Sequence, residues 1–322
     1  MIKKIILNLG LCVSLYAYNE NTFTLNILEG KEFDIHLYSS IKSNTSYGFV
    51  QTKQKQYSFW GSVKNDEYYI DIADFGTCVL KDMHKNKFDA LCKIDEAKKE
   101  FSFLASKTNT MINQLSLKEQ KQLDANKTIE FDFSEDIFKL TSKNEKLNKI
   151  IDDFNENLDK NSLKQKAKES FEKWSKENIS NNEFFSQAYM FYQDEHIISL
   201  GKNIYEYKGG AHGMTNFLRK TYSIDDMKLI NIKNELKIES EDFQNMIKQK
   251  ILSLYSENEL FDIKELKMSE IFEVRKDGLN FIWEPYEIAP YSTGAVEVFI
   301  SFDELKPFWK KNSKLAYLSK IK

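Results

Sequence analysis

The stretch Tyr205-Glu206-Tyr207-Lys208-Gly209-Gly210-Ala211-His212-Gly213 joins two runs of residues that are typical of β-strands, Ser186–Tyr207 and Thr215–Ile224. Three glycines within five positions predict a connection whose backbone takes conformations that a side chain would disfavour. We call residues 209–213 the glycine loop. His212 lies inside it, where a histidine serves either a structural or a functional role, and the two flanking runs predict neighbouring strands of one sheet.

The elements expected around the glycine loop predict an α+β domain over residues 128–322. Strands are expected at 128–133, over 184–232 and at 296–302. Apolar residues at helical spacing predict one helix over 144–177, with a possible break at 159–162, and a second over 241–255. Because strands and helices are segregated, we expect an antiparallel sheet with two main helices.

The preceding part of the chain, residues 18–105, consists of short runs rich in aromatic and β-branched residues, with glycines and polar pairs between them. This spacing predicts an antiparallel β domain that forms a small sandwich or an open barrel. Residues 106–127 are polar and lack glycine and proline. We interpret them as a helical linker at the domain boundary, with Met111, Ile112, Leu115 and Leu117 as its apolar positions.

The first seventeen residues have the pattern of a secretory signal peptide. Lys3 and Lys4 precede an apolar core, and cleavage is expected after Ala17. The apolar run is too short to span a membrane comfortably, and Leu11 stands before Cys12 where a lipoprotein signal needs a small residue. The mature protein is therefore expected to be periplasmic or secreted, without stable membrane insertion.

Composition restricts the possible partners. Hydrophobic residues make up 41% and charged residues 30% of the 322 residues, as in globular proteins. The formal net charge is −3, and it becomes −5 once a leader carrying Lys3 and Lys4 is removed. No basic tract suits nucleic acid, so none is expected as a partner, and a cationic partner would be weakly attracted.

Cys78 and Cys92 are the cysteines that remain after the expected cleavage, and an exported chain favours their pairing. The runs Thr77–Met83 and Lys87–Ile94 predict a hairpin around Lys85. Both cysteines are equally distant from Lys85, so they are expected to face each other and to form a disulfide. A thiol or metal pair is the alternative, with His84 as the nearby additional ligand.

Two separated stretches carry a family resemblance. One is Tyr207-Lys208-Gly209-Gly210-Ala211-His212-Gly213. The other is Trp283-Glu284-Pro285-Tyr286-Glu287-Ile288-Ala289-Pro290-Tyr291 through Gly294, followed by Phe302-Asp303-Glu304-Leu305. In this order, and with a helix between them, they resemble an exported bacterial domain of unknown function. That domain forms the extracellular part of RsiV-type anti-sigma factors and accompanies the peptidoglycan deacetylase PdaC. The resemblance covers roughly residues 128–310.

This resemblance implies a place in the cell envelope. RsiV members bind lysozyme, and PdaC members carry the domain beside a catalytic one. In this chain we expect neither a transmembrane and sigma-binding segment nor a deacetylase module. The four histidines, His36, His84, His196 and His212, include no pair at helical i, i+4 spacing, so no metal site and no cofactor are expected. Only the fold and the envelope location are carried over, with no catalytic residues.

The candidate site combines the glycine loop with residues 285–294, which we call the proline loop. His212 is expected to meet Glu287 or Tyr291, a pairing that suits acid–base chemistry, and the N–H groups around Gly209 and Gly210 suit an anion. The alternative is that His212 only hydrogen-bonds the backbone. Likewise, Trp283, Tyr286 and Tyr291 either form a rigid contact surface or pack beneath the loop as core.

Two functions from different classes follow from these features. The first is a non-enzymatic cell-envelope binding protein that recognises peptidoglycan or a lysozyme-like protein. The second is an envelope glycan hydrolase that uses His212 and Glu287. No G-x-S-x-G motif, P-loop or dinucleotide fingerprint is present, and this favours the binding protein.

Overall fold

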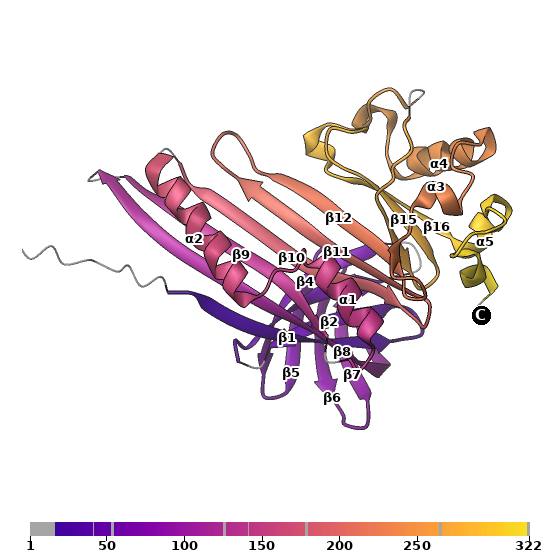
Figure 1. Cartoon of the computed structure of the whole chain (residues 1–322). Coiled ribbons are helices and arrows are strands. Elements are labelled where there is room, and N and C mark those ends of the chain that lie inside the picture. Colours follow the sequence, from indigo (N-terminus) through magenta and orange to yellow (C-terminus); the bar gives the residue numbers. More distant parts are fainter. Residues whose placement is uncertain are drawn as a thin grey trace, which may run out of the picture.

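The computed structural model describes residues 17–320 apart from 41, 53–54, 125–126, 141, 178–179 and 264–265. The signal peptide expected at residues 1–17 therefore lies almost entirely outside the described residues. Within the described part, strands β1 to β13 form one continuous sheet and β14 to β16 form a second sheet. Figure 1 shows the large sheet with helices on one face and the second sheet at its side.

The first eight strands form a closed barrel. Each pairs with the next in antiparallel fashion, and β1 pairs again with β8, from Asn19↔Ser116 to Glu29↔Leu104. The expected β-rich region is present, but the barrel is closed where a sandwich or an open barrel was expected. The strands are β1 (Asn19–Glu29), β2 (Asp34–Ser40), β3 (Thr45–Gln51), β4 (Gln56–Lys64), β5 (Glu67–Ile72), β6 (Gly76–Asp82), β7 (Lys87–Ile94) and β8 (Ala97–Asp124).

Alternate side chains of these strands fill the barrel. Leu37 of β2, Phe59 of β4 and Ile70 of β5 are buried in one cluster with apolar residues of β6, β7 and β8. Because successive side chains of a strand point to opposite faces, every second residue contributes to this interior. The barrel is thus a packed core over most of its length.

The prediction of a helical linker at residues 106–127 is wrong. Residues 97–124 form the single strand β8, which pairs with β7, β1 and β9 in turn. Leu115 and Leu117 are buried at the two-residue spacing of a strand, and Ile112 is buried in a different cluster. The barrel and the rest of the sheet share this strand, while the division of the chain into two domains stays a prediction.

The sheet continues through β9 (Lys127–Leu140), β10 (Asn182–Gln193), β11 (Ile197–Tyr207), β12 (Met214–Ser223) and β13 (Lys228–Leu229). The expected antiparallel pairing holds for most of these strands, but β9 and β10 run parallel, with Asn182↔Phe131 to Ser186↔Glu135 in register. A parallel pair needs a crossover connection, and the two helices between β9 and β10 provide it.

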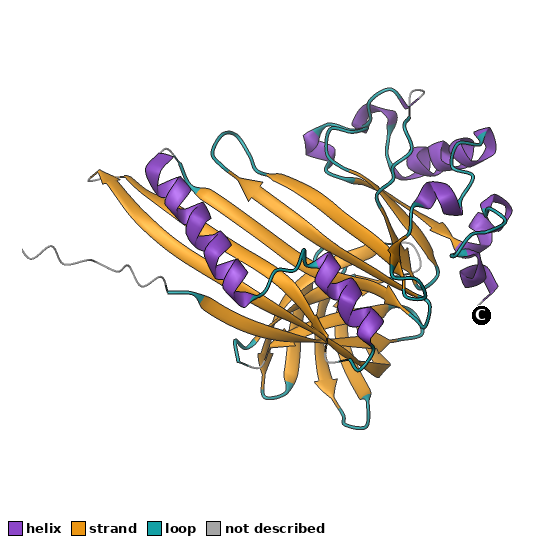
Figure 2. Ribbon diagram, viewed as in Figure 1, coloured by secondary structure: helices purple, strands orange, loops and turns teal. Residues whose placement is uncertain are grey.

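The helix expected over 144–177 is divided into α1 (Glu145–Phe154) and α2 (Lys160–Glu177). The side chain of Asn144 accepts hydrogen bonds from the first N–H groups of α1 and so defines its start. Glu156 and Asn157 take left-handed conformations directly after α1, and they break the helix just before the expected position. Both helices lie on one face of the large sheet (Figure 2).

One wall of the barrel packs against the later strands. Tyr38 and Tyr47 on the outer face of β2 and β3 join Tyr189 and Phe191 of β10 in a buried cluster. The Met190 N–H donates to the Tyr38 hydroxyl oxygen at 2.7 Å, which ties the barrel wall to β10. The sheet therefore folds back on itself with apolar side chains between its two parts.

The C-terminal module contains the second sheet, β14 (Phe272–Arg275), β15 (Gly278–Trp283) and β16 (Val296–Ser301). One face packs on α4, in which Phe243, Ile247 and Ile251 are buried. The helix expected at 241–255 is thereby confirmed. The helices are α3 (Ile232–Glu235), α4 (Glu241–Leu254) and α5 (Phe302–Leu305), with short 3-10 turns η1 (Glu257–Glu259), η3 (Tyr291–Thr293), η4 (Lys306–Phe308) and η5 (Ala316–Lys320).

A buried ion network joins the two sheets. Arg219 of β12 donates to the Glu273 carboxylate of β14 at 2.7 Å, and Arg275 donates to the same carboxylate at 2.7 Å. All three side chains are almost fully buried. Burial alone would raise the pKa of Glu273, but the guanidinium groups of Arg275 and Arg219 outweigh it and hold the pKa below its usual value.

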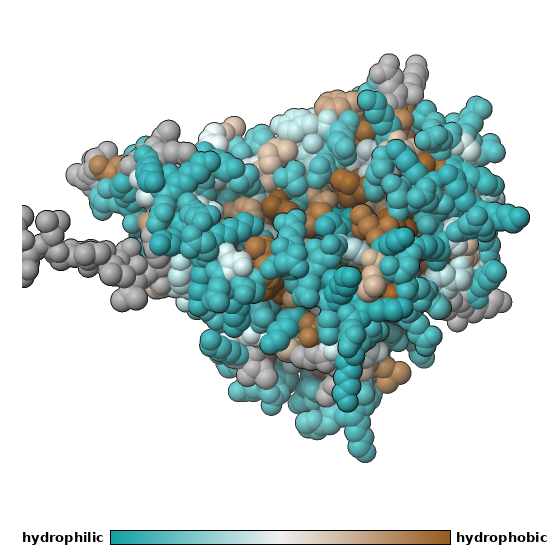
Figure 3. Space-filling view, in the orientation of Figure 1, coloured by the Kyte–Doolittle hydropathy of each residue, from teal (hydrophilic) through white to brown (hydrophobic). Residues whose placement is uncertain are grey.

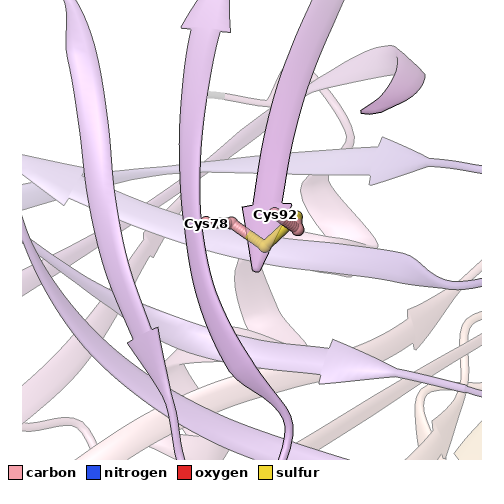
Figure 4. Close-up of a disulfide and its surroundings, with 2 residues drawn as sticks. All are labelled: Cys78 and Cys92. Atoms are coloured by element: carbon pink, nitrogen blue, oxygen red, sulfur yellow. A yellow bond between two sulfur atoms is a disulfide. The ribbon is translucent and has the colours of Figure 1, made fainter. Parts of the chain in front are cut away.

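The disulfide between Cys78 and Cys92 is present, as predicted (Figure 4). The two residues are directly opposed in the β6–β7 pairing, with Cα atoms 4.0 Å apart. His84, Lys85 and Asn86 all have positive φ angles and form the three-residue turn that sets this register. A disulfide is consistent with an oxidising compartment outside the cytosol.

The visible face of the molecule is mostly hydrophilic, with hydrophobic side chains confined to small areas near its middle (Figure 3). None of the helices built from described residues combines the length and the apolar character that crossing a membrane requires.

Replacing both Cys78 and Cys92 with alanine is expected to lower the free energy of unfolding by about 3 kcal/mol, because the denatured chain regains the freedom of a closed loop of this size. Denaturant unfolding of the mature oxidised protein and of the double variant measures this difference. Mass spectrometry of the unreduced protein should show the linked peptide, and two free thiols there would refute the pairing.

His36 makes stability depend on pH. Its ring is buried on the outer wall of β2, and its Nδ1–H donates to the Met190 carbonyl at 3.0 Å. Burial lowers the pKa of His36 to about 4. In the unfolded chain this histidine binds a proton near pH 6.5, whereas in the folded chain it stays neutral down to about pH 4. The stability that comes from the neutral buried ring is therefore present at neutral pH and is lost as the pH falls from about 6.5 towards 4.

We expect the stability difference between the wild type and His36→Gln to shrink by about 2 kcal/mol between pH 7 and pH 5. Glutamine can still donate to Met190 but does not titrate. Asp136, whose pKa burial raises to about 6, titrates in the opposite sense. It is common to both proteins and cancels in the comparison. A difference that is the same at both pH values would contradict the assignment.

Candidate functional site

The glycine loop has the backbone that its sequence predicts. Gly209 and Gly210 have φ angles of 91° and 101°, which residues with a side chain rarely adopt. The Tyr207 hydroxyl donates to the Gly210 carbonyl at 3.2 Å and braces the turn. The loop connects β11 to β12 at the tips of these two strands (Figure 1).

The proline loop is shaped by its own main chain and by one carboxylate. Glu287 Oε2 accepts the Glu284 N–H at 2.6 Å, and Tyr286 N–H donates to the Ala289 carbonyl at 2.9 Å. Tyr286 itself has a φ of 74°, an uncommon conformation for a residue with a side chain. Strained residues of this kind concentrate at functional sites.

The two loops are in contact. The rings of His212 and Tyr291 are stacked, with centroids 3.7 Å apart and planes 17° from parallel. Tyr286 lies beside them, 5.9 Å from the Tyr291 ring centre. His212 Nδ1–H donates to the Gly213 carbonyl at 3.0 Å, so in the neutral ring Nε2 is the acceptor and faces the Tyr286 hydroxyl at 3.4 Å.

Of the aromatic residues expected either in the core or on the surface, one is in the core and two are at the surface. Trp283 is 2% exposed, and its indole N–H donates to the Lys267 carbonyl, so it belongs to the core. Tyr286 is 51% exposed, His212 is also exposed, and Tyr291 is half-buried. Three aromatic rings held by two rigid loops therefore form a surface that is accessible to a partner.

This surface continues onto the strands. Tyr205 of β11 lies beneath Gly213, where an added Cβ atom would come within 2.4 Å of the Tyr205 ring. Phe185 of β10 stacks on Tyr205 with centroids 6.1 Å apart. The rings of Phe185, Tyr205, His212, Tyr291 and Tyr286 thus form a row, which we call the aromatic row. The sequence did not predict a role for Phe185 or Tyr205 in the site, although Tyr205 begins the segment Tyr205–Gly213 that contains the glycine loop.

Glu287 does not join His212. Its carboxylate is engaged with the Glu284 N–H of its own turn, so the expected acid–base pairing is not made. The carboxylate that joins the two halves of the site is that of Glu284, whose Oε1 accepts the Phe217 N–H of β12 at 2.8 Å. The sequence signal for this role was weak, because Glu284 has no recognisable partner within its own motif.

A cavity of about 760 Å³ lies elsewhere, and no residue of the aromatic row lines it. Four of its charged lining residues are paired with each other, Lys250 with Glu304 at 2.8 Å and Arg275 with Glu297 at 3.3 Å. The described part of the chain holds no group of three metal-ligating side chains. The anion site expected near Gly209 and Gly210 stays a prediction.

Two family models match parts of the chain. The family described as "Deacetylase PdaC" matches residues 85–215, from the β6–β7 turn through the glycine loop. The family described as "Protein of unknown function (DUF3298)" matches residues 226–303, including the proline loop. The expected resemblance is confirmed, and it begins further towards the N-terminus than the expected residue 128. A search of curated proteins finds no match.

Two solved structures of DUF3298 family proteins are similar to this chain. A member of the DUF3298 family from Bacteroides fragilis has a TM-score of 0.49 and 14% identity, with 66% of this chain and 99% of that chain covered. A DUF3298 family protein from Pseudomonas aeruginosa has a TM-score of 0.45 and 16% identity, with 62% and 94% covered.

Replacing Glu284 with alanine is expected to destabilise the protein by about 1–2 kcal/mol, because the Phe217 N–H loses its acceptor in a half-buried position. Glu284→Gln keeps an acceptor oxygen of the same reach and should retain most of the stability. Hydrogen exchange at the Phe217 amide reports the contact directly. Equal exchange rates in the alanine and glutamine variants would show that this carboxylate does not link the loops.

Proposed function

We propose that this chain is a non-enzymatic binding protein of the cell envelope, and that the aromatic row binds the glycan of peptidoglycan. The observation that carries the proposal is the exposed stack of His212, Tyr291 and Tyr286 on two rigid loops. Aromatic faces bury the apolar C–H faces of sugar rings, and rigid loops lose little entropy on binding. The disulfide and the resemblance to a family named for a deacetylase support an envelope setting.

The row suits an extended ligand. It runs from Phe185 on β10 across Tyr205 to the two loops, so successive rings are available to successive sugar units. The Tyr205 hydroxyl is protonated at neutral pH, as tyrosine hydroxyls are, and is a hydrogen-bond donor. Burial and the nearby Glu183 carboxylate raise its pKa further. Sugar hydroxyl groups are acceptors for such a donor.

A catalytic role for His212 and Glu287 has less support. General acid–base catalysis on a glycan requires groups that reach the reacting bond, and Glu287 is committed to its own turn. A lysozyme-like protein is the second candidate partner. The acidic net charge expected for the mature chain and the exposed Glu287 beside the row favour a cationic protein.

Purified mature protein is expected to sediment with isolated peptidoglycan sacculi, and His212→Ala and Tyr286→Ala should each weaken this binding about tenfold, since central aromatic residues dominate such surfaces. Melting temperatures should stay within a few degrees, because both side chains are exposed. Tyr69→Ala is the matched control, since Tyr69 is 41% exposed on the barrel, away from the row.

Three outcomes decide between the candidates. No sedimentation with sacculi, or equal losses for Tyr286→Ala and Tyr69→Ala, refutes the glycan site. Binding to immobilised lysozyme that depends on His212 and Tyr286 would favour the protein partner. Release of soluble muropeptides by the wild type, abolished by His212→Ala, would establish the hydrolase instead.

A further inference from the structure

The interior of the barrel changes character along its axis. The inward-facing pairs between β1 and β2 run from Leu28↔Ile35 through Asn26↔Leu37 to Thr24↔Ser39. The first pair is fully apolar and the last is fully polar. On the opposite wall of the barrel, the inward-facing residues change in the same direction, from Ile70 to Tyr68 on β5 and from Cys78 to Asp82 on β6. One end of the barrel is therefore lined by polar side chains.

These residues enclose an open cavity of about 480 Å³, which we call the barrel mouth. Its inner wall is formed by Thr22, Thr24, Asn26, Ser39, Tyr68 and Asp82. Thr24 faces the inside of the barrel and is nevertheless exposed, because the barrel is open at this end. The volume is within the range of about 300–1,000 Å³ that is usual for small-molecule sites, and barrel mouths are among their common positions.

Some hydroxyl groups at this end have no hydrogen-bond partner in the described structure. Ser40 lines the cavity and Ser46 lies directly opposite Ser39, and both side-chain oxygens are buried and unpaired. Buried polar groups in proteins are nearly always satisfied by the protein, by water or by a ligand. Ser46, on the inward face of β3 opposite Ser39, is therefore the hydroxyl at this end of the barrel that water or a ligand would satisfy. Ser40 alternates with Ser39 and faces the outer side of the barrel wall.

The charges around the mouth are compensated in part. Glu20 pairs with Lys160 at 3.1 Å and with Lys164 at 2.6 Å, and Lys42 donates to the Glu20 carbonyl at 3.1 Å. The Asp82 carboxylate is held by the His84 N–H at 2.8 Å. A charged ligand at Glu20 would have to break its ion pairs, whereas a neutral polar ligand leaves them intact. Such a ligand can also donate hydrogen bonds to the Asp82 carboxylate, which has no ion-pair partner among the described residues.

We propose that the barrel mouth binds a small neutral carbohydrate. Hydroxyl and amide side chains both donate and accept, as the hydroxyl groups of a sugar do. The Asp82 carboxylate adds a strong acceptor, and the Tyr68 ring adds an aromatic face for sugar C–H groups. The site is built from β1, β2, β5 and β6 and is separate from the aromatic row, so it stands whether or not the row binds glycan.

The test is titration of the isotope-labelled mature protein by NMR with two probes, N,N′-diacetylchitobiose and the zwitterionic dipeptide Ala-Ala. The disaccharide is expected to shift amide signals around Thr24, Ser39, Tyr68 and Asp82, and the dipeptide is not. Signals of the glycine loop report the aromatic row separately, so binding at either site is recognised without reference to the other.

Thr24→Val combined with Asp82→Asn is expected to weaken the disaccharide effect at the mouth about tenfold, since the valine removes a hydroxyl group and the asparagine replaces a charged acceptor by a weaker neutral one. Thr77→Val is the matched control, because Thr77 is exposed on β6 outside the mouth. The proposal is overturned by absence of mouth shifts at millimolar disaccharide, by equal affinity in the double variant, or by a preference for the dipeptide.

Discussion

The placement of the functional loops depends on the buried carboxylate of Glu273. Arg219 and Arg275 approach it from different strands, and Arg219 also donates to the Lys202 carbonyl and to the Asn203 side chain. A buried charge that loses its partner is strongly destabilising, so the network holds β12 and β14, which belong to different sheets, in one relative position. In this position the proline loop contacts the glycine loop, and Tyr291 stacks on His212.

Sequence patterns predict those features of the structure that are formed by contacts between residues close together in the chain. The mirror placement of Cys78 and Cys92 about a three-residue turn predicts their pairing, because a hairpin fixes the register of its own strands. The apolar spacing and the Ser240 cap likewise predict α4. The meeting of His212 with Tyr291 followed from a weaker argument, that loops of one sheet gather at its end, although the two loops belong to different sheets.

Long-range pairing explains what the sequence did not predict. Residues 106–124 continue a strand because β1, from the start of the chain, lies along one side of it and β9 along the other. Because many of their side chains are polar, their sequence is similar to that of a solvent-exposed helix. The alternation of apolar and polar residues that marks a strand is weak where one face of the sheet is exposed to water. Barrel closure depends on the same distant pairing. The predicted contact of Glu287 with His212 is absent because the Glu287 carboxylate accepts the Glu284 N–H within its own turn.

The free edges of the large sheet are blunted, which bears on how the protein avoids self-association. Exposed strand edges recruit other chains into intermolecular sheets. On the outer side of β12, Glu284 accepts the Phe217 N–H, Ile230 N–H donates to the Thr221 carbonyl, and β13 covers the last residues. Where β8 runs past the end of β1, residues 117–124 are mostly charged or amide-bearing. Neighbouring copies of the chain cannot extend edges of this kind, so the long sheet does not become a template for aggregation.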